Sequence, residues 1–301
     1  YGFTISKFIL EYNTMHTNFK LLINNPILET ANYISIKSEY INQCLSSYLY
    51  LPQITSRPFI FSCFALSVDG KLNYPDLKSG FAIAKYNLAA AEHERYADWW
   101  ILQLARSISD AVIIGSNSLN AEPNDYVAQI NIPELQQLRT ELNKPQNLLH
   151  IIVSRNCNKI DFTNELLCQN NDIPLIIFTQ QAPNVLPSHF IVSNIKELNL
   201  ANKKQIILDN ALDLNRLIQE LYQKGIKTIL NESPYYHHHL QQLQLLDEAW
   251  INQSGVYIGG NTSSLGQFNN SFAVNTHPHY TILTLYSLGY NFVYPRYKIN
   301  Y

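Results

Sequence analysis

The sequence predicts an α/β fold with a mainly parallel central sheet covered by helices. Apolar runs of strand length alternate along the chain with segments of helical period, as in βαβ units. Residues 59–66 form the clearest run, rich in Phe and Ile, and fit a strand buried on both faces. Residues 87–109 have the longest helical pattern, with apolar residues at i, i+4, i+7 and i+11 from Ala97.

The remaining elements follow the same alternation. We expect further strands at residues 110–115, 148–153, 173–179, 190–192, 226–231 and 247–253, and further helices at 212–225 and 235–245. Residues 119–146 are polar and are expected to form a loop with a short helix. Two long runs, 280–288 and 290–299, are separated by Gly289 and predict an antiparallel hairpin at the sheet edge.

The first part of the chain is expected to stand apart from this sheet. Residues 20–36 and 39–51 hold mixed apolar positions that fit short helices. Pro52 and Pro58 bracket a linker, because the residue before a proline is biased away from the helix. We therefore expect residues 1–56 to be an N-terminal arm or helical extension, and residues 57–301 to be the main domain.

Composition excludes several classes of function. Of the 301 residues, 46% are hydrophobic and 15% are charged, and the formal net charge is -2, so a nucleic-acid partner is not expected. No apolar run is long enough to span a bilayer, and the first residues lack a signal-peptide pattern. The four cysteines form no C-x-x-C pair, which favours reduced thiols and a cytoplasmic location.

Polar residues follow several of the predicted strands, where open α/β sheets bind their ligands. Asp69-Gly70-Lys71 follows the run 59–66, and Glu232-Ser233 follows the strand 226–231. Gly115 to Ser118 and Ser154-Arg155 follow two others, and a loop contributes Gly259-Gly260. Taken alone, each segment is more often a solvated turn or a helix cap than part of a site.

Other ligand motifs are missing or unsuitable. The chain has neither G-x-G-x-x-G nor a P-loop sequence. His237, His238 and His239 are consecutive, so on a helix they point about 100° apart and cannot bind one ion. No metal site is predicted.

The order of these segments resembles the reductase domain of the riboflavin-pathway deaminase–reductases. That domain opens with an Arg-Pro strand ending in Ser-x-Asp-Gly and a basic residue, as RPFIFSCFALSVDGKL does from Arg57. A Ser-Gly element and a helix running into a D-A-V-x-x-G strand come next, matched by Ser79-Gly80 and residues 104–115. The strand ending Ser154-Arg155, a partial match at residues 230–234 and the glycine loop complete the likeness, which covers 57 to about 299.

The resemblance implies a dihydrofolate-reductase-like three-layer fold, with a mostly parallel sheet, an antiparallel C-terminal hairpin and helices on both faces. It implies NADPH as cofactor and hydride transfer to C1′ of the ribosyl group of 5-amino-6-(5-phosphoribosylamino)uracil. A homodimer is expected, as in relatives. The zinc-deaminase signature is absent, so the expected activity is reduction alone.

The resemblance also assigns roles to residues. Matched to catalytic positions are Asp69, Lys71 and Glu232; to substrate positions, Ser79 and Arg106; and to cofactor positions, Gly115, Ser118, Ser154, Arg155, Ser233, Gly259 and Gly260. By this match Lys71 is a hydrogen-bond donor or proton source near the ribosyl oxygens. Arg106 is a phosphate clamp, and Ser154 and Arg155 meet the adenosine 2′-phosphate.

Two departures keep other functions open. The family's Glu-Gly-Gly is Glu232-Ser233-Pro234 here, which removes one N–H donor, and the segment at 122–126 lacks the family's substrate-binding Arg. A first alternative is an NADPH reductase of a pterin-like or other small carbonyl or imine substrate. A second is a non-catalytic paralogue that keeps the fold for binding or assembly.

Overall fold

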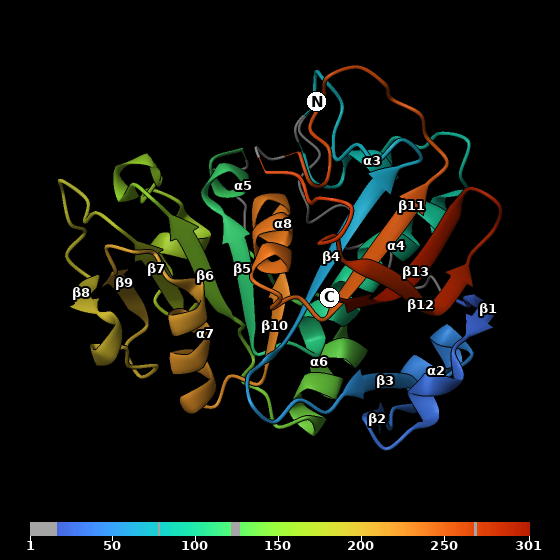
Figure 1. The fold of residues 1–301 in the computed structure, drawn as a ribbon, viewed down its shortest axis with the longest axis horizontal. Coiled ribbons are helices and arrows are strands. Elements are labelled where there is room, and N and C mark those ends of the chain that lie inside the picture. The colour runs from blue at the N-terminus through green and yellow to red at the C-terminus, as the bar shows by residue number, and fades with distance from the viewer. Residues whose placement is uncertain (1–16, 78, 122–126, 268–269) are drawn as a thin grey trace.

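Eleven strands form one sheet in the computed structural model, which describes residues 17–77, 79–121, 127–267 and 270–301. The parallel strands are β4 (Phe59–Ser67), β5 (Ala111–Gly115), β6 (Leu149–Ser154), β7 (Leu175–Thr179), β8 (Ile191–Asn194), β9 (Lys204–Leu208), β10 (Thr228–Asn231) and β11 (Glu248–Ser254). Three antiparallel strands extend the sheet: β1 (Lys20–Asn24), β12 (His279–Ser287) and β13 (Phe292–Asn300). The order is β1-β12-β13-β11-β4-β10-β5-β6-β7-β9-β8 (Figure 1).

Helices cover both faces of this sheet. They are α2 (Glu39–Leu45), α3 (Ala82–Lys85), α4 (Glu92–Ser107), α5 (Ser116–Ala121), α6 (Pro133–Glu141), α7 (Leu214–Gln223) and α8 (Pro234–Gln242). Short helical turns lie at Pro26–Glu29, Cys157–Lys159, Glu165–Gln169 and Ile195–Glu197. Among the residues described, no helix is long and apolar enough to cross a membrane.

The core is divided by the sheet into two hydrophobic clusters. One lies against α4 and α6 and includes Trp100 and Phe61, and the other lies against α7 and α8 and includes Leu217 and Ile60. In Figure 1, α7 and α8 lie in front of the sheet and α4 lies behind it. Because Phe61 and Ile60 point to opposite clusters, β4 is buried on both faces, as its sequence predicted. The predicted three-layer α/β fold is confirmed.

The predicted long helix begins later than its pattern suggested. It starts at Glu92 because Ala91 is extended (φ -63°, ψ 158°) and its N–H donates to the Glu94 carboxylate at 2.7 Å. The hydrogen bond satisfies a donor that the helix itself leaves unpaired.

The N-terminal segment differs more from its prediction. Instead of a helix, residues 20–36 hold β1 and β2 (Tyr33–Ile36), and residues 39–51 hold α2 followed by part of β3 (Leu49–Pro52). Strand β1 pairs with β12, so the predicted hairpin β12–β13 forms but is not the edge of the sheet. Strand β9 was missed altogether, because its sequence begins with the polar pair Lys204-Gln205. A domain division at residue 57 stays a proposal.

Candidate active site

The chain crosses the sheet in one direction after β4 and in the opposite direction after β10. Helix α4 leads from β4 past β10 to β5, whereas α8 leads from β10 past β4 to β11. The two helices pack on opposite faces. The carboxyl ends of β4 and β10 therefore form a topological switch point, the place where open α/β sheets bind ligands. In Figure 1 this edge is at the top.

The turn after β4 and the loop after β11 are hydrogen-bonded to each other at this edge. Asp69 accepts hydrogen bonds from the backbone N–H groups of Gly259 (2.7 Å) and Ile258 (3.2 Å). It also accepts one from the Ser67 hydroxyl at 2.7 Å. The Ser67 hydrogen bond, followed by those of the two N–H groups, lowers the pKa of Asp69 to about 2. The carboxylate therefore stays ionised at neutral pH.

Lys71 contacts the same loop from the other side of its glycine pair. The Lys71 Nζ donates to the Gly260 carbonyl at 2.9 Å, the Ser264 hydroxyl at 3.1 Å and the Thr262 carbonyl at 3.5 Å. An ammonium carries three N–H donors, so each is directed at the loop. The predicted turn and glycine loop therefore lie side by side, and hydrogen bonds between the two hold them together.

The end of β10 is fixed by one buried amide. Asn231 donates through Nδ2 to the Ser62 hydroxyl (2.9 Å) and to the Ser233 carbonyl (3.0 Å), and its Oδ1 accepts from the Ser233 N–H (3.1 Å). Ser233 is the N-cap of α8 and Pro234 occupies the first turn. A first-turn N–H has no partner within the helix, so Pro234 fits there without costing α8 a hydrogen bond.

Arg106 and Glu232 form a buried ion pair. Arg106 Nε and Nη2 donate to the two carboxylate oxygens of Glu232, each at 2.7 Å, and the side chains are only 6% and 8% exposed. Arg106 Nη1 also donates to the Gln129 carbonyl at 3.3 Å. The guanidinium thus holds a carboxylate in two-point contact, and the phosphate-clamp role of Arg106 stays a prediction. Glu232 likewise faces Arg106.

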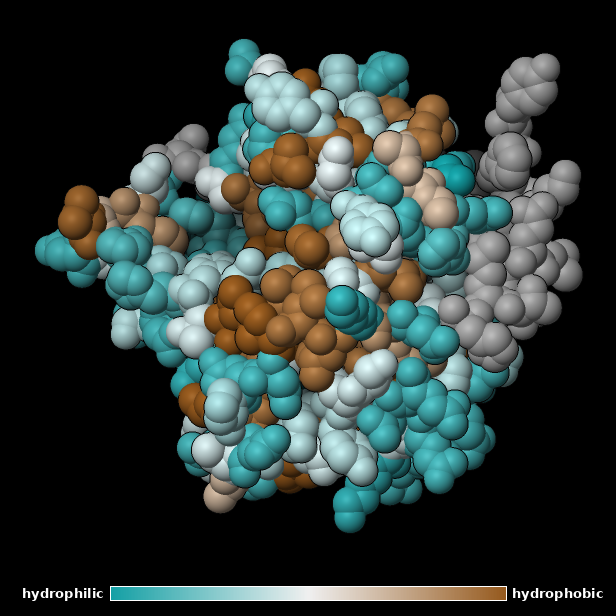
Figure 2. Space-filling model, turned by 90° about the vertical axis from the view of Figure 1, so that its right-hand side faces the viewer, coloured by the Kyte–Doolittle hydropathy of each residue, from teal (hydrophilic) through white to brown (hydrophobic). Residues whose placement is uncertain are grey.

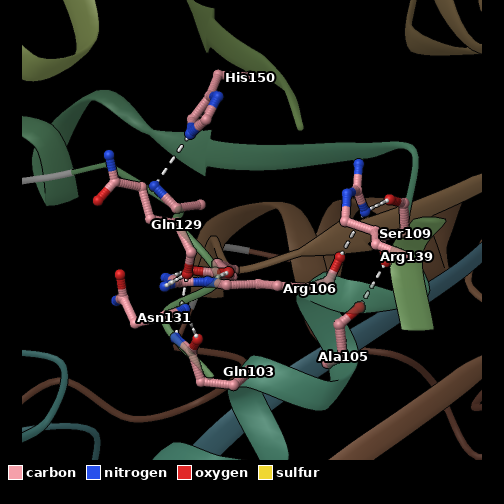
Figure 3. Close-up of polar contacts among 10 residues, drawn as sticks. Gln103, Ala105, Arg106, Ser109, Gln129, Asn131, Arg139 and His150 are labelled. Atoms are coloured by element: carbon pink, nitrogen blue, oxygen red, sulfur yellow. Dashed lines mark hydrogen bonds and ion pairs between the residues drawn. The ribbon is translucent and has the colours of Figure 1, made fainter. Parts of the chain in front are cut away.

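Residues 128–131 are held against this ion pair by two buried side chains (Figure 3). Gln103 donates to the Gln129 carbonyl (3.1 Å) and accepts from the Asn131 N–H (2.6 Å). His150 accepts from the Ala128 N–H at 3.0 Å. Burial lowers the pKa of His150 to about 4, so its ring is neutral and can accept that hydrogen bond.

Sequence reasoning did not find this part of the site. Gln103 precedes Arg106 by three residues, so the two share one face of α4, and that spacing was the available signal. The contact of His150 with Ala128 joins distant parts of the chain and has no local pattern.

Several solved structures share this arrangement of elements. A pyrimidine reductase-like protein from Corynebacterium diphtheriae superposes with a TM-score of 0.60 at 16% identity, over 81% of this chain and 92% of its own. RibD from Acinetobacter baumannii gives 0.57 at 17%, over 82% of this chain and 59% of its own. The riboflavin biosynthesis reductase from Saccharomyces cerevisiae gives 0.52 at 12%, over 83% and 93%. At these identities the likeness establishes the fold.

No curated protein sequence matches the chain. Residues 58–285, well over half of the chain, match the RibD C-terminal domain family. The chain belongs to the RibD C-terminal domain family. This confirms the resemblance seen in the sequence and the dihydrofolate-reductase-like fold, and it places the chain among the riboflavin-biosynthesis-type reductases.

The remaining predicted residues of this RibD C-terminal domain lie at three places. Ser79 precedes α3, and its carbonyl accepts from the Ala82 N–H at 3.1 Å. Gly115 ends β5 beside Val153 of β6, so the segments after β5 and β6 are neighbours. Gly115 therefore shares the sheet edge with the switch point.

The two predicted residues at the end of β6, Ser154 and Arg155, differ in their surroundings. The Ser154 hydroxyl donates to the Asn156 carbonyl at 3.0 Å, and Arg155 is exposed. The side chain of Ser118, and the segment 122–126 in which the family's Arg has no counterpart, lie outside the described residues.

A buried acid below the site was also missed. Asp98 of α4 accepts a hydrogen bond from Asn252 of β11 at 2.7 Å. Burial raises the pKa of Asp98 to about 6. No sequence pattern marked Asp98 as buried on the apolar face of α4, because Glu92, Glu94 and Asp98 together resembled the solvated start of a helix.

Proposed function

We propose that this chain is an NADPH-dependent reductase that transfers a hydride to C1′ of the ribosyl group of 5-amino-6-(5-phosphoribosylamino)uracil. The observation that carries the proposal is the convergence of family-matched segments at one switch point: Asp69-Gly70-Lys71, Glu232-Ser233 and Gly259-Gly260. Membership of the RibD C-terminal domain family supports the reaction class.

The residues at this edge suit a phosphorylated dinucleotide. Arg155 is exposed and forms no hydrogen bond with a described residue, so its guanidinium is available to a 2′-phosphate. Ser233 begins α8, so a pyrophosphate beside it would lie at the positive end of the helix dipole. The buried Thr262 hydroxyl of the glycine loop has no partner within the described part of the chain, so it is left for a ligand.

The cofactor would supply the hydride, and the chain would supply position and charge. Gly259 and Gly260 would let the loop backbone approach the nicotinamide. Glu232, held by Arg106, would face the substrate with a fixed carboxylate edge. The ion pair would keep that edge rigid, because moving either side chain would break two charge-assisted hydrogen bonds.

Cofactor choice can be tested by fluorescence titration with NADPH and NADH. We expect NADPH to bind more tightly, and Arg155→Ala to weaken NADPH about tenfold or more while NADH changes little, since a charge-assisted contact is lost. A wild-type protein that binds neither nucleotide would exclude the reductase and favour a non-catalytic paralogue.

A second candidate is an NADPH reductase of an unphosphorylated pterin-like, carbonyl or imine substrate. The ion pair of Arg106 with Glu232 favours it, because that guanidinium is not open to a phosphate. Turnover of the ribosylaminopyrimidine with and without its 5′-phosphate separates the two. The first proposal expects the phosphate to raise kcat/KM, and equal rates would support the second.

We also propose a cytoplasmic homodimer. All four cysteines are free and buried, which suits a reducing compartment. The β1 side of the molecule carries a group of apolar side chains (Figure 2), and Leu22 and Ile23 of β1 are 47% and 41% exposed. Light scattering of wild type and of Ile23→Glu would test this, with a monomeric variant expected.

A further inference from the structure

We propose that Asp69 and Lys71 serve the reaction by positioning the Gly259-Gly260 loop, and that neither contacts the reacting atoms. The inference rests on the reductase function proposed above and changes the part that the turn plays in it. Both residues become positioning residues for the wall of the site that the loop forms.

The two charges act on opposite sides of the glycine pair. Asp69 accepts from the N–H groups of Ile258 and Gly259. Lys71 donates to the carbonyls of Gly260 and Thr262. Gly259 and Gly260 have φ values of +71° and +63°, so the chain is left-handed at two successive residues. Such a turn leaves its own N–H and C=O groups without regular partners, and the side chains supply them.

The hydrogen-bonding capacity of both side chains is used by these contacts. Lys71 directs its three donors at Gly260, Thr262 and Ser264, so protonating a substrate oxygen would require breaking one of them. The Asp69 carboxylate accepts three hydrogen bonds and remains ionised. It therefore has no proton to give at neutral pH.

Main-chain hydrogen bonds join the same two segments. The Val68 N–H donates to the Val256 carbonyl at 2.9 Å, and the Leu72 N–H donates to the Ser263 carbonyl at 2.9 Å. The charged side chains thus lie within a short ladder that sets the loop in register with the turn. Further along, the loop is held by His238 of α8, whose Nε2 lies 2.7 Å from the Asn270 carbonyl.

Hydrogen–deuterium exchange of the free protein tests the positioning step without relying on activity. Asp69→Asn places an amide NH2 against backbone donors, and Lys71→Met removes all three donors. We expect the amides of 256–264 to exchange about tenfold faster or more in both variants, since hydrogen bonds to charged groups are lost. Asp76→Asn is the matched control, because Asp76 is exposed and forms no hydrogen bond with a described residue. It should exchange as wild type does.

Steady-state kinetics then separate positioning from chemistry. We expect Asp69→Asn and Lys71→Met to raise the KM for the nicotinamide nucleotide about tenfold or more, with the shape of the kcat–pH profile unchanged. Lys71→Arg should recover most of the loss, because it keeps the charge and the donors.

Two results would overturn the proposal. One is wild-type exchange of residues 256–264 in both variants. The other is Lys71→Met losing kcat and one limb of the pH profile while exchange stays unchanged, which would make Lys71 a proton donor. If wild-type protein binds no nicotinamide nucleotide, the proposed function fails, while the exchange data still decide whether the turn positions the loop.

Discussion

The turn between β12 and β13 approaches α4 so closely that Gly289 has no room for a side chain. A Cβ there would overlap the carboxylate of Glu94, and Gly289 has a φ of +69°. Glu94 uses that carboxylate to accept from the Tyr290 N–H (2.9 Å) and the Asn291 amide (3.2 Å). The turn is thereby fixed to the first turn of α4.

We expect Gly289→Ala to lower the free energy of unfolding by about 2–4 kcal/mol, from left-handed strain plus lost hydrogen bonds to a charge. Gly266→Ala is the control, because Gly266 also has a positive φ (+81°) but nothing within 4 Å of the added carbon. It should lose only the strain, about 1–2 kcal/mol. Equal losses in urea unfolding would show that Glu94 moves aside freely.

The buried pair of Arg106 and Glu232 gives a second expectation. Arg106→Met leaves the buried Glu232 carboxylate without its guanidinium and should cost about 3–5 kcal/mol. The double variant Arg106→Met/Glu232→Met should cost less than the sum of the two single variants. Arg216→Met is the control: its guanidinium is 46% exposed beside Asp209, and the expected loss is below about 1 kcal/mol. Denaturant unfolding of the four variants measures this, and additive losses would contradict the coupling.

These residues show where prediction from sequence stops. The positions of Arg106 and Glu232 followed from motif order, but their partnership did not. A guanidinium in the last turn of a helix and a carboxylate after a strand look alike whether they meet a ligand or each other. That choice depends on distances between segments 126 positions apart in the chain.

At the scale of elements, the first part of the chain belongs to the main core. Phe19 is 1% exposed and its ring lies 5.0 Å from that of Tyr294 and 5.5 Å from that of Trp100. The carbonyl of Tyr50 in β3 also accepts from the buried Arg296 at 2.7 Å. The extension therefore completes one cluster of the core.

We expect Phe19→Ala to cost about 3–5 kcal/mol, as large core truncations do. Ile34→Ala in strand β2 is the control, because Ile34 is 54% exposed and should change stability by no more than about 0.5 kcal/mol. Thermal unfolding compares the two. Similar small losses would indicate that residues 17–56 are a dispensable arm.

Elements with a clear period could be predicted, and elements without one could not. Strand β4 and helix α4 have strong apolar patterns. Strand β9 contains the buried Lys204, whose Nζ donates to the carbonyls of Leu167 (2.5 Å) and Ile173 (2.6 Å). A lysine at the start of a five-residue strand leaves only a short apolar run, and only those tertiary contacts explain its burial.

At the scale of the molecule, alternation of strands and helices was enough to predict the layers, because a parallel sheet requires crossovers on its faces. The switch point follows from strand order, which periodicity does not contain. That order comes from the structure, in which β10 lies between β4 and β5.

The stability of the whole molecule should depend on pH through Asp98. Burial raises its pKa from 3.8 to about 6, so the folded protein holds a proton that the unfolded chain releases. Its contribution is therefore most favourable at low pH and is lost as pH rises from about 4 through 6.

Asp98→Asn removes this dependence while keeping an oxygen that can accept from Asn252. Relative to wild type, the variant should gain about 2 kcal/mol in free energy of unfolding between pH 4 and pH 7, as most of a shift of roughly two pKa units falls in this range. Taking the difference cancels opposing groups such as His150, whose lowered pKa destabilises the fold as pH falls below 6.5. Urea unfolding at pH 4, 5, 6, 7 and 8 measures the difference. A difference that stays constant across this range would mean that Asp98 is ionised in the folded protein throughout.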